Sequence, residues 1–284
     1  MVMYMDEKFS ELKIIAAASC MGAPDQRCAL GPEAVMTALG QQGQVIAPGT
    51  VDGAEALASY MVELAHAVAT RLTDAPRLAI LSGDHSCAIG SWRGVGRAVN
   101  GPLGLIWIDA HMDAHTPETS PSGYWHGMPV AALLGEGELG REGAVVLPQN
   151  LCLLGVRSYE APEAELLQRL GVRVITMEEI KRIGFEAAMT EAVAIASAGT
   201  AGYGVSIDMD GIDPADAPGV GSPVVGGIPA ADLLPALAHL QADSLFRALE
   251  VAEFNPVMDK EQRTLQLVLQ ILKLISGAEH EFND

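Results

Sequence analysis

An acidic and histidine-rich triplet directly after an apolar run is the first candidate for chemistry in this chain. Asp109, His111 and Asp113 stand at alternate positions after the run 105–108. In an extended chain, alternate residues point to the same side, so two carboxylates and an imidazole would converge there. Two like charges about 4 Å apart repel by roughly 4 kcal/mol at an effective dielectric constant of 20, which predicts a bound cation. The alternative is that the two aspartates cap the next element and that the histidine belongs to the core.

Two further clusters of the same kind favour a metal site over that alternative. Asp208 and Asp210 follow the β-rich run 204–207, and His85 follows the run 78–82. Ligands of open α/β sheets bind at the carboxyl ends of the strands, where all three clusters would lie. We therefore predict one metal centre assembled from three strand ends.

The elements that would position these clusters alternate between strands and helices along the whole chain. Strands are expected at 13–18, 44–47, 77–81, 105–108, 151–156, 172–176, 205–207 and 245–251, with helices between them. This alternation predicts a parallel sheet between helical layers. No linker or repeat divides the sequence, so residues 1–284 are expected to form one domain.

Composition excludes several classes of partner. A net charge of −19 over 284 residues argues against binding to nucleic acid or to an anionic membrane surface. The polar opening residues and the lack of a long apolar run argue against a signal peptide or a membrane span.

Four dispersed cysteines favour reduced thiols and a cytoplasmic location, although Cys20 and Cys28 flank a loop and could pair. For Cys87, packing in the turn after His85 is expected.

Four sequence blocks resemble the ureohydrolase (arginase/agmatinase) family, and the stretch 116–131 is most similar to its arginase branch. The blocks are Gly83-Asp84-His85-Ser86, Asp109-Ala110-His111-Met112-Asp113, Ser206-Ile207-Asp208-Met209-Asp210-Gly211-Ile212-Asp213-Pro214 and Glu253-Phe254-Asn255-Pro256. The resemblance implies a three-layer α/β/α sandwich with a central, mostly parallel eight-stranded sheet. It also implies a binuclear manganese site with two Mn²⁺ ions per chain. One ion would be held by His85, Asp109, Asp113 and Asp208, and the other by His111, Asp109, Asp208 and Asp210.

The implied reaction is the hydrolysis of a guanidino compound to urea and an amine. His126 matches the histidine that shuttles protons in the family, and Glu253 matches the carboxylate that pairs with the guanidinium. Asp84 and Asp213 would not bind the metals themselves but would orient the ligands that do. By analogy with the family, the chain would form a homo-oligomer, a trimer or a hexamer.

The substrate-binding residues depart from the arginase pattern. His115 and Tyr124 stand where arginases usually carry two asparagines, whereas Ser122 matches the family serine. Glu160 stands near an aspartate that contacts the α-amino group of the substrate, and Ser82 replaces the first glycine of the usual Gly-Gly-Asp-His block. Three hypotheses follow: an arginase acting on L-arginine or a close relative, a sister amidinohydrolase for agmatine, guanidinobutyrate or a modified arginine, and a non-catalytic metal-binding relative.

Overall fold

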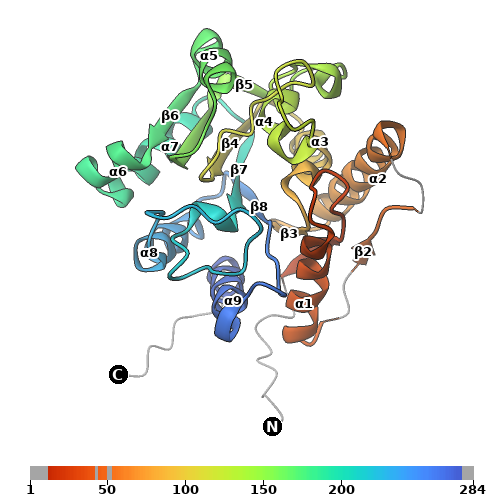
Figure 1. The fold of residues 1–284 in the computed structure, drawn as a ribbon, viewed down its shortest axis with the longest axis vertical. Coiled ribbons are helices and arrows are strands. Elements are labelled where there is room, and N and C mark those ends of the chain that lie inside the picture. The colour runs from red at the N-terminus through yellow and green to blue at the C-terminus, as the bar shows by residue number, and fades with distance from the viewer. Residues whose placement is uncertain (1–11, 42–43, 50–52, 277–284) are drawn as a thin grey trace.

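A wholly parallel eight-stranded sheet forms the centre of the protein (Figure 1). We describe it from a computed structural model that covers residues 12–41, 44–49 and 53–276. The strand order is β2-β1-β3-β8-β7-β4-β5-β6. The strands are β1 (Lys13–Ala17), β2 (Gln44–Ile46), β3 (Leu78–Ser82), β4 (Leu103–Ile108), β5 (Val146–Val156), β6 (Arg173–Thr176), β7 (Gly202–Asp208) and β8 (Phe246–Ala252). Each corresponds to one of the eight predicted strands, so the predicted parallel sheet is confirmed.

Helices cover both faces of the sheet and complete the predicted three-layer sandwich. The helices are α1 (Leu30–Ala38), α2 (Ala54–Thr73), α3 (Ala88–Val99), α4 (Pro129–Leu133), α5 (Ala161–Leu170), α6 (Met177–Ile183), α7 (Phe185–Ser197), α8 (Ala230–Leu240) and α9 (Arg263–Ile275). One buried cluster joins the sheet to α1 and α6 to α9, and a second joins it to α2 to α5. Figure 1 shows α8 and α9 on one side of the strands and α2 and α3 on the other. Among the described helices, none is long and apolar enough to cross a membrane.

The four central strands place their carboxyl ends at one level. Every residue of β3, β4 and β7 is buried, which is why their sequences, apart from Asp208 at the end of β7, are continuously apolar or small rather than alternating. Ile207 pairs with Ile108 of β4 on one side and with Val251 of β8 on the other, and Val251 also pairs with Leu81 of β3. The segments that leave these strands therefore begin side by side.

A disulfide between Cys20 and Cys28 corrects the expectation that all four cysteines are reduced. Asp25 caps the short 3-10 helix Gln26–Ala29, its side chain accepting a hydrogen bond from the backbone N–H of Arg27. This turn reverses the direction of the chain, and the Cα atoms of the two cysteines lie 6.1 Å apart. The other two cysteines, Cys87 and Cys152, are free and buried, and Cys87 packs as predicted.

Candidate metal centre

The structure brings all six predicted ligands to the carboxyl edge of the central strands. His85 begins a 3-10 turn after β3, and Asp109 is the first residue after β4. Asp208 ends β7, and Asp210 lies in the 3-10 turn Met209–Gly211. The remaining two, His111 and Asp113, lie in the irregular segment after β4.

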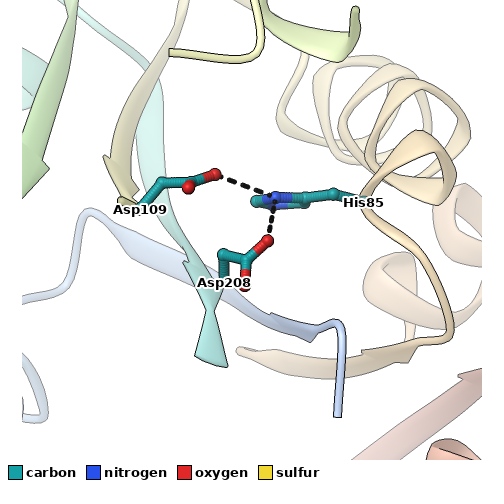
Figure 2. Close-up of side chains that lie close together, drawn as sticks. All are labelled: His85, Asp109 and Asp208. Carbon is teal, nitrogen blue, oxygen red and sulfur yellow. Dashed lines mark ion pairs between the residues drawn. The ribbon is translucent and has the colours of Figure 1, made fainter. Parts of the chain in front are cut away.

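The first group of ligands surrounds the Nδ1 atom of His85. This nitrogen lies 3.2 Å from the nearest carboxylate oxygen of each of three aspartates, Asp109, Asp113 and Asp208. Figure 2 shows two of these carboxylates, Asp109 and Asp208, directed at the imidazole. None of the described residues forms a hydrogen bond of good geometry with this buried nitrogen. A buried nitrogen without such a partner, facing three carboxylates, fits a metal ligand.

The second group shares one aspartate with the first. His111 Nδ1 lies 3.5 Å from Asp109 Oδ1 and 3.2 Å from Asp210 Oδ2, whereas the other oxygen of Asp109, Oδ2, faces His85. The two oxygens of one carboxylate thus face two different imidazoles. This is the arrangement expected of a residue that bridges two metal subsites.

Charge within the cluster is unbalanced without a cation. Burial opposes ionisation of Asp109, but the adjacent imidazoles of His111 and His85 outweigh it and lower the pKa of this carboxyl. Burial raises the pKa of Asp208 well above its ordinary value. Burial and the nearby charge of Asp109 raise the pKa of Asp113 to about 7. The raised pKa values of Asp113 and Asp208 arise because four carboxylates cannot all ionise in one buried place, whereas two divalent cations would balance them.

Backbone geometry at the centre is strained where the ligands and the pocket meet. Asp113 has φ of 49° and Glu253 has φ of 65°, values that non-glycine residues rarely adopt. Gly83 is required for a different reason, because a Cβ atom there would lie 2.0 Å from the carbonyl oxygen of Ser19. Strain of this kind is held by the surrounding fold and concentrates at functional sites.

The two predicted orienting residues, Asp84 and Asp213, hold loops, and neither forms a hydrogen bond with a ligand side chain among the described residues. Asp84 accepts hydrogen bonds from the backbone N–H groups of Ser86, in the turn that carries His85, and of Gly22. Asp213 accepts from the N–H groups of residues 215, 226 and 227 and so holds the loop after β7. Trp107 was not predicted, although it lies in the apolar run before Asp109. Its indole N–H donates to Asp109 at 3.0 Å, and its ring stacks on His85.

A pocket of about 220 Å³ opens onto this cluster. The predicted metal ligands, acid–base pair and substrate-binding residues all line it except His85 and Asp109, which are buried. The predicted acid and its partner are adjacent, because His126 Nδ1 lies 3.3 Å from Glu253 Oε1. Burial lowers the pKa of His126, but the hydrogen bond and charge of Glu253 outweigh burial and raise it to about 9. The imidazole is therefore a protonated donor at neutral pH in the metal-free protein.

The predicted substrate-binding residues lie around the mouth of the pocket, and two of them contact each other. His115 Nε2 meets Glu160 Oε2, while His115 Nδ1 lies 3.1 Å from Thr119 Oγ1. Glu163, which was not predicted, forms a capping box with Glu160 at the start of α5 and also lies 3.5 Å from His115. The sequence signal that could have predicted this capping box is the Glu-x-x-Glu spacing around Pro162 at the start of a helix.

The other two predicted residues at the mouth lie on the exposed loop 116–124. Ser122 Oγ accepts a hydrogen bond from the backbone N–H of Tyr124, whose side chain is exposed. The phenol of Tyr124 meets the ring of His126 edge-on, at 6.2 Å between centroids. The structure therefore groups all four predicted substrate-binding residues at one opening.

Comparison with known proteins agrees with this geometry. A sequence model of the arginase family matches residues 11–276. The arginase of Bacillus caldovelox is 38% identical over 203 residues, which cover 70% of this chain and 68% of that protein. The arginase of Brevibacillus brevis is 39% identical over 220 residues, or 76% of this chain and 74% of the other. The crystal structure of the Bacillus subtilis arginase superposes with a TM-score of 0.85 at 31% identity, covering 94% of this chain and 99% of that one. The chain belongs to the arginase family and is a hydrolase of guanidino carbon–nitrogen bonds.

Proposed function

We propose that this chain is a binuclear manganese enzyme that hydrolyses the guanidinium group of L-arginine to urea and ornithine, with one catalytic domain spanning residues 1–284. The observation that carries the proposal is the shared carboxylate of Asp109 between two imidazoles, beneath a pocket whose wall holds the His126–Glu253 pair. The curated relatives described above are named arginases, which supports arginine as the substrate.

The donor set fits Mn²⁺. Four carboxylates and two imidazoles offer hard and intermediate ligands without thiolate, which suits Mn²⁺ better than Cu⁺ or a structural zinc ion. We assign His85, Asp109, Asp113 and Asp208 to one ion and His111, Asp109, Asp208 and Asp210 to the other. When bound, the two ions would supply a water-derived nucleophile at neutral pH.

The side chains of the pocket account for binding and proton transfer. The Glu253 carboxylate would accept hydrogen bonds from the planar guanidinium and fix it above the metal centre. His126 lies 3.3 Å from that carboxylate, so a guanidinium held by Glu253 would also be within reach of the His126 proton. An amine leaves poorly unless it is protonated, and this defines His126 as the general acid.

A second candidate substrate is another guanidino compound, such as agmatine or guanidinobutyrate. The observation that favours it is the contact between His115 and Glu160, which occupies the polar groups that replace the arginase pattern. None of the described residues lining the pocket is lysine or arginine, so the pocket offers a substrate carboxylate no fixed cation, which favours agmatine, with no carboxylate, over guanidinobutyrate.

A urea-release assay over these three compounds tests both candidates. After manganese loading, L-arginine should give the highest kcat/KM, and His126→Ala should lower turnover on every substrate that the wild type accepts. His115→Asn with Tyr124→Asn should shift the ratio of kcat/KM values by about ten- to a hundredfold toward L-arginine, because one misfitted polar contact is worth about 1–3 kcal/mol. The absence of urea from all three compounds, with two manganese ions bound, would refute the proposal.

We also propose that the enzyme acts in the cytoplasm as a homo-oligomer, a trimer or a hexamer. It would have a small-molecule substrate and no nucleic-acid or membrane partner, consistent with its net charge of −19. Light scattering coupled to size-exclusion chromatography would measure the oligomeric state directly.

A further inference from the structure

Glu250 is a buried carboxylate in the middle of the sheet that the metal centre and the pocket leave unexplained. It lies on β8, between β3 and β7, and is 0% exposed. No described lysine, arginine or histidine forms an ion pair with it. Its hydrogen-bond partners are two hydroxyl groups: Ser82 Oγ donates to Oε1 at 2.7 Å, and Ser206 Oγ donates to Oε2 at 2.8 Å. Burying a carboxylate is costly, so its retention among apolar strands indicates a role.

The hydrogen bonds lead from Glu250 to a metal ligand. Ser206 Oγ also lies 2.9 Å from His85 Nε2, on the opposite side of the imidazole from the three aspartates. A carboxylate can only accept hydrogen bonds, so the Ser206 hydroxyl proton is directed at Glu250. The Ser206 oxygen must then accept from His85, which places the imidazole proton on Nε2. The lone pair is left on Nδ1, the atom that faces the metal centre.

We propose that Glu250 is a positioning residue that sets the metal-binding tautomer of His85 through Ser206, with Ser82 holding its second oxygen. The inference rests on the proposed metal centre. It also explains why a serine stands at position 82, where the related sequence block has glycine. The Ser82 side chain reaches Glu250, whereas the next residue, Gly83, has no room for a Cβ atom. Mutation of a group that hydrogen-bonds to the second ring nitrogen of a metal-ligating histidine commonly changes metal affinity by about ten- to a hundredfold.

Manganese titration of the full-length protein, in two single-subsite backgrounds, tests this inference. His111→Ala should leave the subsite of His85, and His85→Ala should leave the other. In the first background, Glu250→Gln and Ser82→Ala should each weaken Mn²⁺ binding, by about tenfold for Glu250→Gln. In the second background neither variant should change the dissociation constant by more than about twofold, because the hydrogen-bonded chain no longer ends at a ligand.

Thr264→Val provides a matched control, since Thr264 is also fully buried and its hydroxyl accepts a hydrogen bond from the backbone N–H of Gly219, far from His85 along the sequence. It should affect neither background. Circular dichroism would verify that each variant is folded, and Ser82→Ala keeps the test available if Glu250→Gln does not fold. In otherwise wild-type protein, elemental analysis after dialysis should find one ion retained per chain in Glu250→Gln where the wild type retains two.

Equal weakening in both backgrounds, or none in either, would overturn the role of Glu250. A wild-type protein that binds no manganese would overturn both this inference and the proposed metal centre. Normal manganese binding with the expected background dependence, but no urea from any guanidino compound, would refute the proposed function and leave the inference standing.

Discussion

The ion pair between His126 and Glu253 should make the stability of the metal-free protein depend on pH in a way that one substitution removes. The two side chains are 30% and 11% exposed, and their nearest atoms are 3.3 Å apart. Burial lowers the pKa of His126, but Glu253 outweighs it and raises the pKa from 6.5 to about 9. At 1.36 kcal/mol for each pKa unit, this difference corresponds to about 3 kcal/mol of preference for the protonated imidazole in the folded state.

The direction of the pH dependence follows from the raised pKa. Below pH 6.5, His126 is protonated in both the folded and the unfolded chain, and the full contribution to the free energy of unfolding is present. Between pH 6.5 and about 9 the unfolded chain loses its proton first, so the contribution declines as pH rises. Above about pH 9 it is gone.

Glu253→Gln should remove most of this dependence. Urea denaturation of the metal-free protein measures this. Between pH 6 and pH 9.5, the free energy of unfolding of the wild type should fall by about 3 kcal/mol more than that of Glu253→Gln. Imidazole NMR should show the pKa of His126 falling when the carboxylate is neutralised. As a control, Glu253→Gln in a His126→Gln background should have the same effect on unfolding at both pH values. A difference between the wild type and Glu253→Gln that stays constant from pH 6 to 9.5 would refute this account of the pair.

Two further predictions concern the metal centre and the disulfide. Asp109→Ala should abolish binding of both metal ions, because the two oxygens of Asp109 face two subsites. His111→Ala should abolish binding of one metal ion only. Elemental analysis that finds one metal ion lost from each of the two variants would contradict the bridging role of Asp109. Reduction of the Cys20–Cys28 disulfide, which closes a loop with a sequence separation of 8, should lower the free energy of unfolding by about 2.5 kcal/mol on loop entropy. Urea denaturation with and without dithiothreitol measures this effect, and a Cys20→Ser, Cys28→Ser double variant should not respond to the reductant. An equal response of the wild type and the double variant would contradict it.

Much of the fold, and the set of side chains that the structure gathers at the candidate metal centre, could be predicted from the sequence alone. Strands buried on both faces must be continuously apolar, so Leu78–Ser82 and Leu103–Ile108 can be recognised from composition. Parallel strands end at a common edge, and the polar residues that follow them are therefore brought together. These are consequences of local periodicity and burial, and they hold before any long-range contact is known.

The way in which the ligands converge was decided by tertiary structure. The expectation of an extended chain after residue 108 was wrong, because β4 ends there and Asp113 adopts a left-handed conformation. As a result, Asp109 lies between the two subsites, and Asp113 joins the first of them. The alternation rule named residues that do lie together, but it could not give their division into two groups, since that depends on a backbone conformation that the surrounding fold imposes.

The remaining contacts join segments far apart in the sequence, and no local pattern encodes them. His126 meets Glu253, His115 meets Glu160, and Glu250 reaches His85 through a serine on another strand. A lone glutamate within an apolar strand needs a partner, but the local sequence does not show which residue that partner is. Residue type and periodicity determined which side chains lie at the active edge of the sheet. Strand order and loop closure decided which of them touch, because only the assembled sheet fixes the distances between separate strand ends.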